Sequence, residues 1–89
     1  MKLKEIRRTK GLSQSQLAKK AGLNIRTLQY YEQGVKSFDR ARLTTILKCA
    51  IALDCRIDEI IEDKDCLILL EKYKEARTFE TDVTTYSDF

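Results

Sequence analysis

Residues 11–34 read GLSQSQLAKKAGLNIRTLQYYEQG, and this stretch decides the fold. Ser13 is a good N-cap, and Gln16, three residues later, completes a capping box at the start of a helix. Gly22 ends that helix after about two turns, and Asn24 can cap a second helix, which the last glycine of the stretch ends. Two short helices joined by about three residues around a glycine form a helix-turn-helix.

Helical spacing continues on both sides of this stretch. Before it, a helix is expected over roughly residues 2–10, and Gly11 ends it. After it, we expect a helix that starts with Asp39 as its N-cap and runs to about residue 53. A short fifth helix over residues 57–62 and a sixth over about residues 65–77 follow. The predicted fold class is therefore all-α, with five short helices and an additional C-terminal helix.

The chain divides into three parts by composition. Residues 1–62 form the helix-turn-helix domain, and residues 63–77 form a C-terminal helix that is a candidate dimerisation element. Residues 78–89 are rich in threonine and acidic side chains, and we see no helical periodicity in them. We therefore expect a tail that is disordered alone or extended on a partner.

Length and composition exclude several classes of protein. Eighty-nine residues allow one small domain with a tail. No apolar run approaches the roughly 20 residues of a membrane span, and no secretory signal is visible. The three cysteines, Cys49, Cys55 and Cys66, lack CxxC spacing, and the chain has no histidine. We therefore expect no metal site and no cofactor, but buried or partly buried thiols in a reducing cytoplasm.

Charge is distributed unevenly along the chain. Residues 1–62 hold 13 basic and 7 acidic side chains, a net charge of +6, whereas residues 63–89 hold 4 and 7, a net charge of −3. A basic body suits an anionic partner, although an ordinary solvated surface has the same composition.

The motifs together resemble a known family. Residues 11–23 and 28–34, followed by residues 47–53 and 57–61, are similar to the Cro and phage lambda repressor type of helix-turn-helix proteins, the XRE-type regulators. The likeness covers about residues 2–62. It implies a compact five-helix domain whose second helix lies over the DNA backbone and whose third enters the major groove. Members usually bind two-fold operators as dimers.

The chain departs from the family pattern in two places. The turn between the fourth and fifth helices usually has glycine and then serine or threonine, where this chain has Asp54 and Arg56. Aspartate tolerates left-handed geometry better than most residues, so we expect the turn to survive with a weaker cap. Ile51 stands where the family often has a charged residue.

In this motif the outward side of the third helix reads base edges in the major groove. Arg26 suits a bidentate pair with guanine, Gln29 suits adenine, and the apolar Ile25 suits a thymine methyl group. A solvated helix surface is the alternative for each. The predicted base contacts are Ile25, Arg26, Gln29 and Tyr30.

The predicted phosphate contacts are Ser13, Gln14, Asn24 and Lys36. Gln14 begins the second helix, where backbone amides and the helix dipole favour a phosphate. The resemblance places Lys36 in a loop that lies along the DNA backbone. It also implies an ion pair between Arg7 of the first helix and Glu32 at the end of the third, the alternative being Arg7 on a phosphate.

One short helix reads too few bases for strong specificity, so we expect a homodimer. Residues 66–70 are apolar around more than one helical face, and such a surplus often marks an interface. The predicted dimer interface is Ile51, Leu67, Leu70 and Tyr73. The alternative is that this helix only completes the core of the monomer.

The predicted function is sequence-specific binding of double-stranded DNA by a bacterial or phage regulator, a repressor that is cytoplasmic and nucleoid-associated when bound. The main alternative is an antitoxin whose C-terminal segment, residues 78–89, binds a toxin while the helix-turn-helix regulates the operon. A module that binds a non-DNA partner is a further alternative. An enzyme is not expected, because the chain has no histidine, no Gly-rich phosphate loop and no convincing carboxylate pair.

Overall fold

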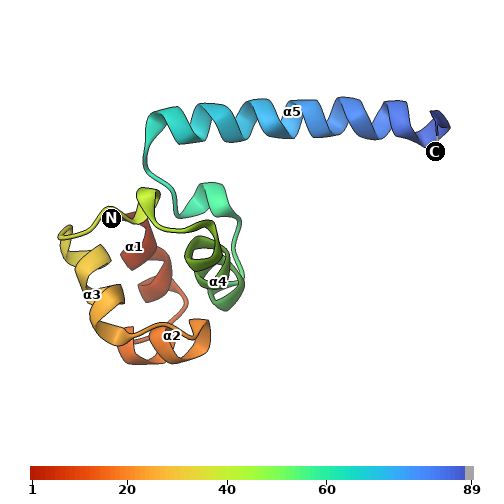
Figure 1. Cartoon of the computed structure of the whole chain (residues 1–89). Helices are drawn as coiled ribbons and strands as arrows, with labels where there is room; N and C mark the ends of the chain where they lie inside the picture. The colour runs from red at the N-terminus through yellow and green to blue at the C-terminus, as the bar shows by residue number, and fades with distance from the viewer. Residues whose placement is uncertain (88–89) are drawn as a thin grey trace.

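The computed structural model describes the backbone of residues 1–87 and the side chains of residues 1–76. All the secondary-structure elements in this part of the chain are helices, with no strands, which confirms the all-α prediction. Its elements are α1 (Lys2–Thr9), α2 (Gln14–Ala21), α3 (Ile25–Gln33), the 3₁₀ turn η1 (Phe38–Arg40), α4 (Leu43–Leu53), the 3₁₀ turn η2 (Ile57–Glu59) and α5 (Lys64–Ser87). The first four helices pack together, and α5 extends away from them (Figure 1).

Local signals in the sequence position α2 and α3. The Ser13 hydroxyl oxygen accepts a hydrogen bond from the Gln16 backbone N–H at 3.0 Å, and the Gln16 side chain accepts one from the Ser13 backbone N–H at 2.8 Å. Gly22 ends α2 with φ of 70°. The Asn24 side chain then caps α3 by accepting from the Arg26 backbone N–H at 2.8 Å. The predicted capping box, turn and cap are therefore all confirmed.

A single apolar core holds the helix-turn-helix. Leu17 of α2 and Leu28 of α3 are fully buried, and α2 packs against both α3 and α4. The largest fully buried side chains are Leu3, Leu17, Leu28, Cys49, Leu53 and Ile60. Because Leu28 faces inward, the opposite side of α3 faces solvent.

The three thiols lie where the sequence predicted, since Cys49 is buried and Cys55 and Cys66 are half-buried. Burial raises the pKa of the Cys49 thiol to about 11. Its nucleophilic thiolate form is therefore rare at neutral pH.

The prediction for the start of the fourth helix is wrong. Asp39 lies in η1, and α4 begins only at Leu43. The η1 turn buries Phe38, whose ring meets that of Tyr31 edge to face with centroids 5.3 Å apart. Instead of capping α4, the Asp39 carboxylate accepts hydrogen bonds from the backbone N–H groups of Glu62 and Asp63, at 3.0 and 3.1 Å. This long-range contact fixes the linker that precedes α5, residues 60–63.

Two further predictions need correction. The fifth helix is only the 3₁₀ turn η2, and the last helix continues to Ser87 where the sequence predicted a non-helical tail from residue 78. No glycine or proline follows Gly34 to stop a helix. Positions 79, 83 and 86 are moreover apolar at intervals of four and three, a helical spacing that the threonine-rich composition obscured. Residues 88 and 89 lie outside the described residues.

A carboxylate caps the start of α5. The Asp63 side chain accepts from the backbone N–H groups of Asp65 and Cys66, at 2.8 and 3.2 Å.

In the part of the chain that is described, no helix combines the length and the apolar character that crossing a membrane requires.

Asp54 is the one residue other than glycine with positive φ in the described chain, at 51°, and it ends α4 in the left-handed region. We expect Asp54→Gly to raise the free energy of unfolding by about 0.5 kcal/mol, because relief of the left-handed strain exceeds the added entropy of the unfolded chain. Asp54→Ala should lower it. Urea unfolding followed by circular dichroism measures both, and a glycine variant less stable than the parent would contradict the assignment.

Candidate nucleic-acid interface

Several side chains on the outer side of α3 are accessible to solvent. Ile25 is 40% exposed and Tyr30 is 36% exposed. Arg26 is also exposed, whereas Gln29 is half-buried. The structure thus brings the four predicted base-contact residues to the accessible side of one helix, with buried Leu28 on the other.

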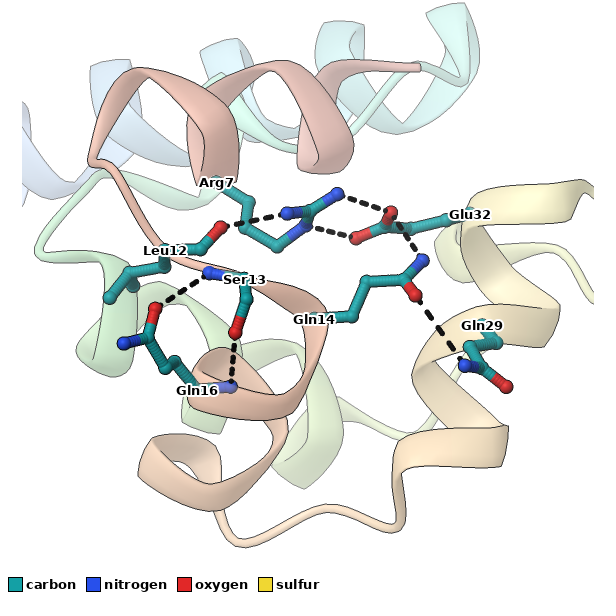
Figure 2. A network of polar contacts seen from close by, with 7 residues as sticks. All are labelled: Arg7, Leu12, Ser13, Gln14, Gln16, Gln29 and Glu32. Atoms are coloured by element: carbon teal, nitrogen blue, oxygen red, sulfur yellow. Dashed lines mark hydrogen bonds and ion pairs between the residues drawn. The ribbon is translucent and has the colours of Figure 1, made fainter.

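Beneath this helix lies a polar network that joins α1, α2 and α3 (Figure 2). Arg7 donates two hydrogen bonds to the Glu32 carboxylate, from Nε at 2.7 Å and from Nη2 at 2.9 Å. Its Nη1 donates to the Leu12 carbonyl at 2.7 Å. The two ionised side chains are only 8% and 1% exposed. Arg7 therefore holds the end of α3 against α1, and it is too enclosed to meet a phosphate.

The environment of Glu32 keeps its carboxyl ionised. Burial by itself raises its pKa, but the hydrogen bonds from Arg7 and Gln14 and the nearby charges of Arg7 and Lys4 outweigh burial. The pKa of Glu32 therefore lies below its ordinary value of 4.5.

Gln14 and Gln29 extend the network to the protein surface. The Gln14 amide donates to Glu32 Oε1 at 3.0 Å, and its oxygen accepts from Gln29 Nε2 at 3.5 Å. Gln29 keeps one amide hydrogen and its oxygen, so it can both donate and accept at a base edge. Gln14 keeps one amide hydrogen and the backbone N–H of the first residue of α2, both of which can donate to a phosphate.

The remaining predicted phosphate contacts retain free donors. Ser13 and Asn24 use side-chain oxygens as cap acceptors, which leaves the hydroxyl hydrogen and the amide NH₂ able to donate. Lys36 is exposed in the segment after α3, with its Nζ 5.7 Å from the centre of the Tyr30 ring. This cation–π contact links the predicted phosphate-contact loop to the outer side of α3.

The same segment carries two basic residues that the sequence analysis did not single out. Arg40 in η1 and Arg42 before α4 are both exposed. Together with Lys36 they make three cationic side chains within seven residues. That density of positive charge is the signal in the sequence that identifies them.

The four residues of the predicted dimer interface do not all lie together. Ile51, Leu70 and Tyr73 line a groove of about 600 Å³ between α4 and α5, where Leu47 joins them. Ile51 is 77% exposed and Tyr73 is 62% exposed. Leu67 instead packs partly against the core of its own domain.

Comparison with known proteins gives one match. A family model described as helix-turn-helix matches residues 3–60, which is more than half of the chain. A search of curated proteins finds no match. A search of solved structures finds none either.

The Arg7–Glu32 pair yields a stability prediction. Glu32→Gln leaves the Arg7 charge buried without its partner, so we expect the free energy of unfolding to fall by about 3 kcal/mol at neutral pH. In the parent protein, the lowered pKa of Glu32 stabilises the fold above pH 4.5, and this stabilisation is lost as the pH falls through the folded-state pKa. The variant should lack that part of the acid sensitivity. Urea unfolding from neutral pH to about pH 3 measures both effects.

The matched control is Glu71→Gln, which neutralises an exposed carboxylate on α5. It should change stability by less than about 0.5 kcal/mol. A similarly small loss for Glu32→Gln would mean that the buried pair does not hold α3.

Proposed function

Because the chain belongs to the XRE and lambda repressor-like helix-turn-helix family of DNA-binding regulators, we propose that it is a transcriptional repressor. It binds a two-fold operator as a homodimer and reads bases with the outer side of α3. The observation that carries this proposal is the accessible side of α3, held in place by the network beneath it.

Arg26 is the main base-reading residue. It lies in the first turn of α3, and in this kind of helix the N-terminal turns meet the base edges. Its guanidinium can donate to both O6 and N7 of guanine. Gln29, held through its amide nitrogen by Gln14, offers the oxygen and hydrogen that adenine N6 and N7 require.

Ser13, Gln14, Asn24 and Lys36 position the domain on the DNA backbone. Three of them stand at or beside the N-termini of α2 and α3, where the backbone N–H groups point outward and favour an anion. Lys36 adds a full positive charge from the following loop. These contacts supply affinity for any duplex and place α3 in the groove, but they do not distinguish one base from another.

The homodimer forms through α5 and the groove beside it. Exposed apolar side chains are concentrated there, including Ile51 on α4 and Ile68, Leu69 and Tyr73 on α5. A second copy of α5 against this surface would remove these groups from water, which favours association. A two-fold arrangement places two α3 helices on successive half-sites of a palindromic operator.

The antitoxin alternative depends on the side chains of residues 78–89, which lie outside the described ones. No described feature favours a toxin as partner over a second copy of the chain. Repression by a homodimer is therefore the function that the described residues support best.

Two substitutions separate base reading from backbone binding. Arg26→Ala should relax the preference at one base position by about 1–3 kcal/mol. Lys36→Ala should weaken binding to all sequences alike and make the affinity less dependent on salt. Competition binding across operator variants, with the operator first selected from random duplex DNA, measures both. If Arg26→Ala leaves the base preference unchanged, Arg26 does not read a base.

A second pair tests the dimer surface. Ile51→Asp places a charge in the groove and should convert the protein to monomers at micromolar concentration. Leu43→Asp is the matched control, because Leu43 is exposed on the same helix but does not line the groove. Sedimentation equilibrium measures both. If the two variants sediment alike, the groove is not the dimer interface.

A further inference from the structure

We propose that Asp39 determines which half-site spacing the protein accepts, by holding the base of α5 to the loop that follows the recognition helix. This inference rests on the proposed dimer through α5. It assigns a role in specificity to a carboxylate whose two oxygens are both bonded to the linker.

Asp39 clamps the linker from both of its oxygens. Oδ1 accepts from the Glu62 backbone N–H at 3.0 Å, and Oδ2 accepts from the Asp63 backbone N–H at 3.1 Å. Two bonds to adjacent peptide groups fix orientation as well as position. Asp63 in turn caps α5 through the backbone N–H groups of Asp65 and Cys66. The chain of bonds therefore runs from η1 directly into the first turn of α5.

On its other side the clamp adjoins the surface that faces DNA. Asp39 lies in η1 between Lys36 and Arg42, among the cationic side chains of the segment that follows α3. Lys36, Asp39 and Glu62 also line one cavity of about 370 Å³ where that segment meets the linker. The segment after α3 is thus next to the base of α5, and the Asp39 carboxylate connects the two.

Other contacts support the same geometry. The Lys2 backbone N–H donates to Glu62 Oε1 at 2.9 Å, and its Nζ donates to the Ile61 carbonyl at 2.9 Å. Further along α5, Lys74 donates to Asp58 of η2 at 2.9 Å. These contacts anchor α1 and η2 to the linker and to α5. Among the described residues, the hydrogen bonds that connect the linker to the segment after α3 are those of Asp39.

The direction of α5 matters because the proposed partner subunit packs against α5 and the groove between α5 and α4, whose shape depends on that direction. In a two-fold dimer the recognition helices lie one helical turn of DNA apart, about 34 Å. A change of about 10° at the linker would displace the second recognition helix by about 6 Å, nearly two base pairs. A fixed linker therefore selects one spacing, whereas a loose linker accepts several.

The test compares the full-length protein with Asp39→Ala, which removes both acceptors, and Asp39→Asn, which keeps one. Asp65→Asn is the matched control, because it neutralises an exposed carboxylate in the first turn of α5 whose side chain makes no hydrogen bond to the linker within the described residues. Each protein is titrated with a single half-site duplex and with a series of two-half-site duplexes whose spacing changes by one base pair. Hydrogen exchange at the Glu62 and Asp63 amides reports on the clamp itself.

We expect the parent protein and Asp65→Asn to bind one spacing at least about tenfold more tightly than its neighbours. Asp39→Ala should reduce this preference to below about threefold, with half-site affinity within about twofold of the parent and faster amide exchange at both positions. Asp39→Asn should lie between, and it serves as the test if the alanine variant fails to fold.

Three results would overturn the inference. Asp39 variants that keep the parent's spacing preference would show that Asp39 does not determine the spacing. The proposed function would stay intact in that case. If the Asp39 variants lose as much affinity for the single half-site duplex as for the two-half-site duplex, Asp39 stabilises the DNA-binding domain itself. It would then not act on the placement of the partner subunit. A parent protein that binds every spacing alike would overturn both this inference and the proposed dimer.

Discussion

The bidentate pair between Arg7 and Glu32 is the interaction on which the rest of the interface depends. It joins the first helix to the last turn of the third, and Glu32 also receives the Gln14 amide. Taking two charges out of water offsets much of their attraction, so a pair of this kind contributes more to geometry than to net stability. Its hydrogen bonds are directional, and they orient α3 about its own axis. That orientation decides which side chains of α3 remain outside.

The interface combines rigid and adaptable parts. Caps, left-handed glycines and the buried leucines fix α2 and α3 as a unit, as their hydrogen bonds and burial indicate. Polar side chains at the margin, such as Ser13 and Asn24, satisfy the backbone with one atom and keep another free. The same residues therefore end the helices and equip them to meet an anion.

Sequence reasoning was most successful where the decisive interactions are local. The capping box of Ser13 and Gln16, the Asn24 cap and the glycine turns all involve residues within a few positions of one another, so the pattern predicts them directly. Asp39 also has the sequence features of an N-cap. Only the tertiary fold, by burying Phe38 and delivering the linker 23 residues later, gives that carboxylate different partners.

The end of the chain shows a different limit. Composition suggested a tail after residue 77, yet a helix continues when nothing in the sequence stops it and its apolar spacing persists. The groove beside α5 was foreseen only as a surplus of apolar side chains. Leu67 packs partly against the core of its own domain, and helical periodicity alone does not tell which of two apolar faces meets the body of the domain.

The separation between the supporting network and the outer side of α3 has an evolutionary consequence. Within the described residues, the side chains of Ile25 and Arg26 make no hydrogen bond to their own protein, and the network that orients their helix contacts it through Gln29 and Glu32 instead. Replacing either therefore leaves the scaffold intact. If α3 reads bases as proposed, a lineage descended from this chain can acquire a new target site through one or two codon changes, and paralogues that share its framework can diverge into regulators with different target sites.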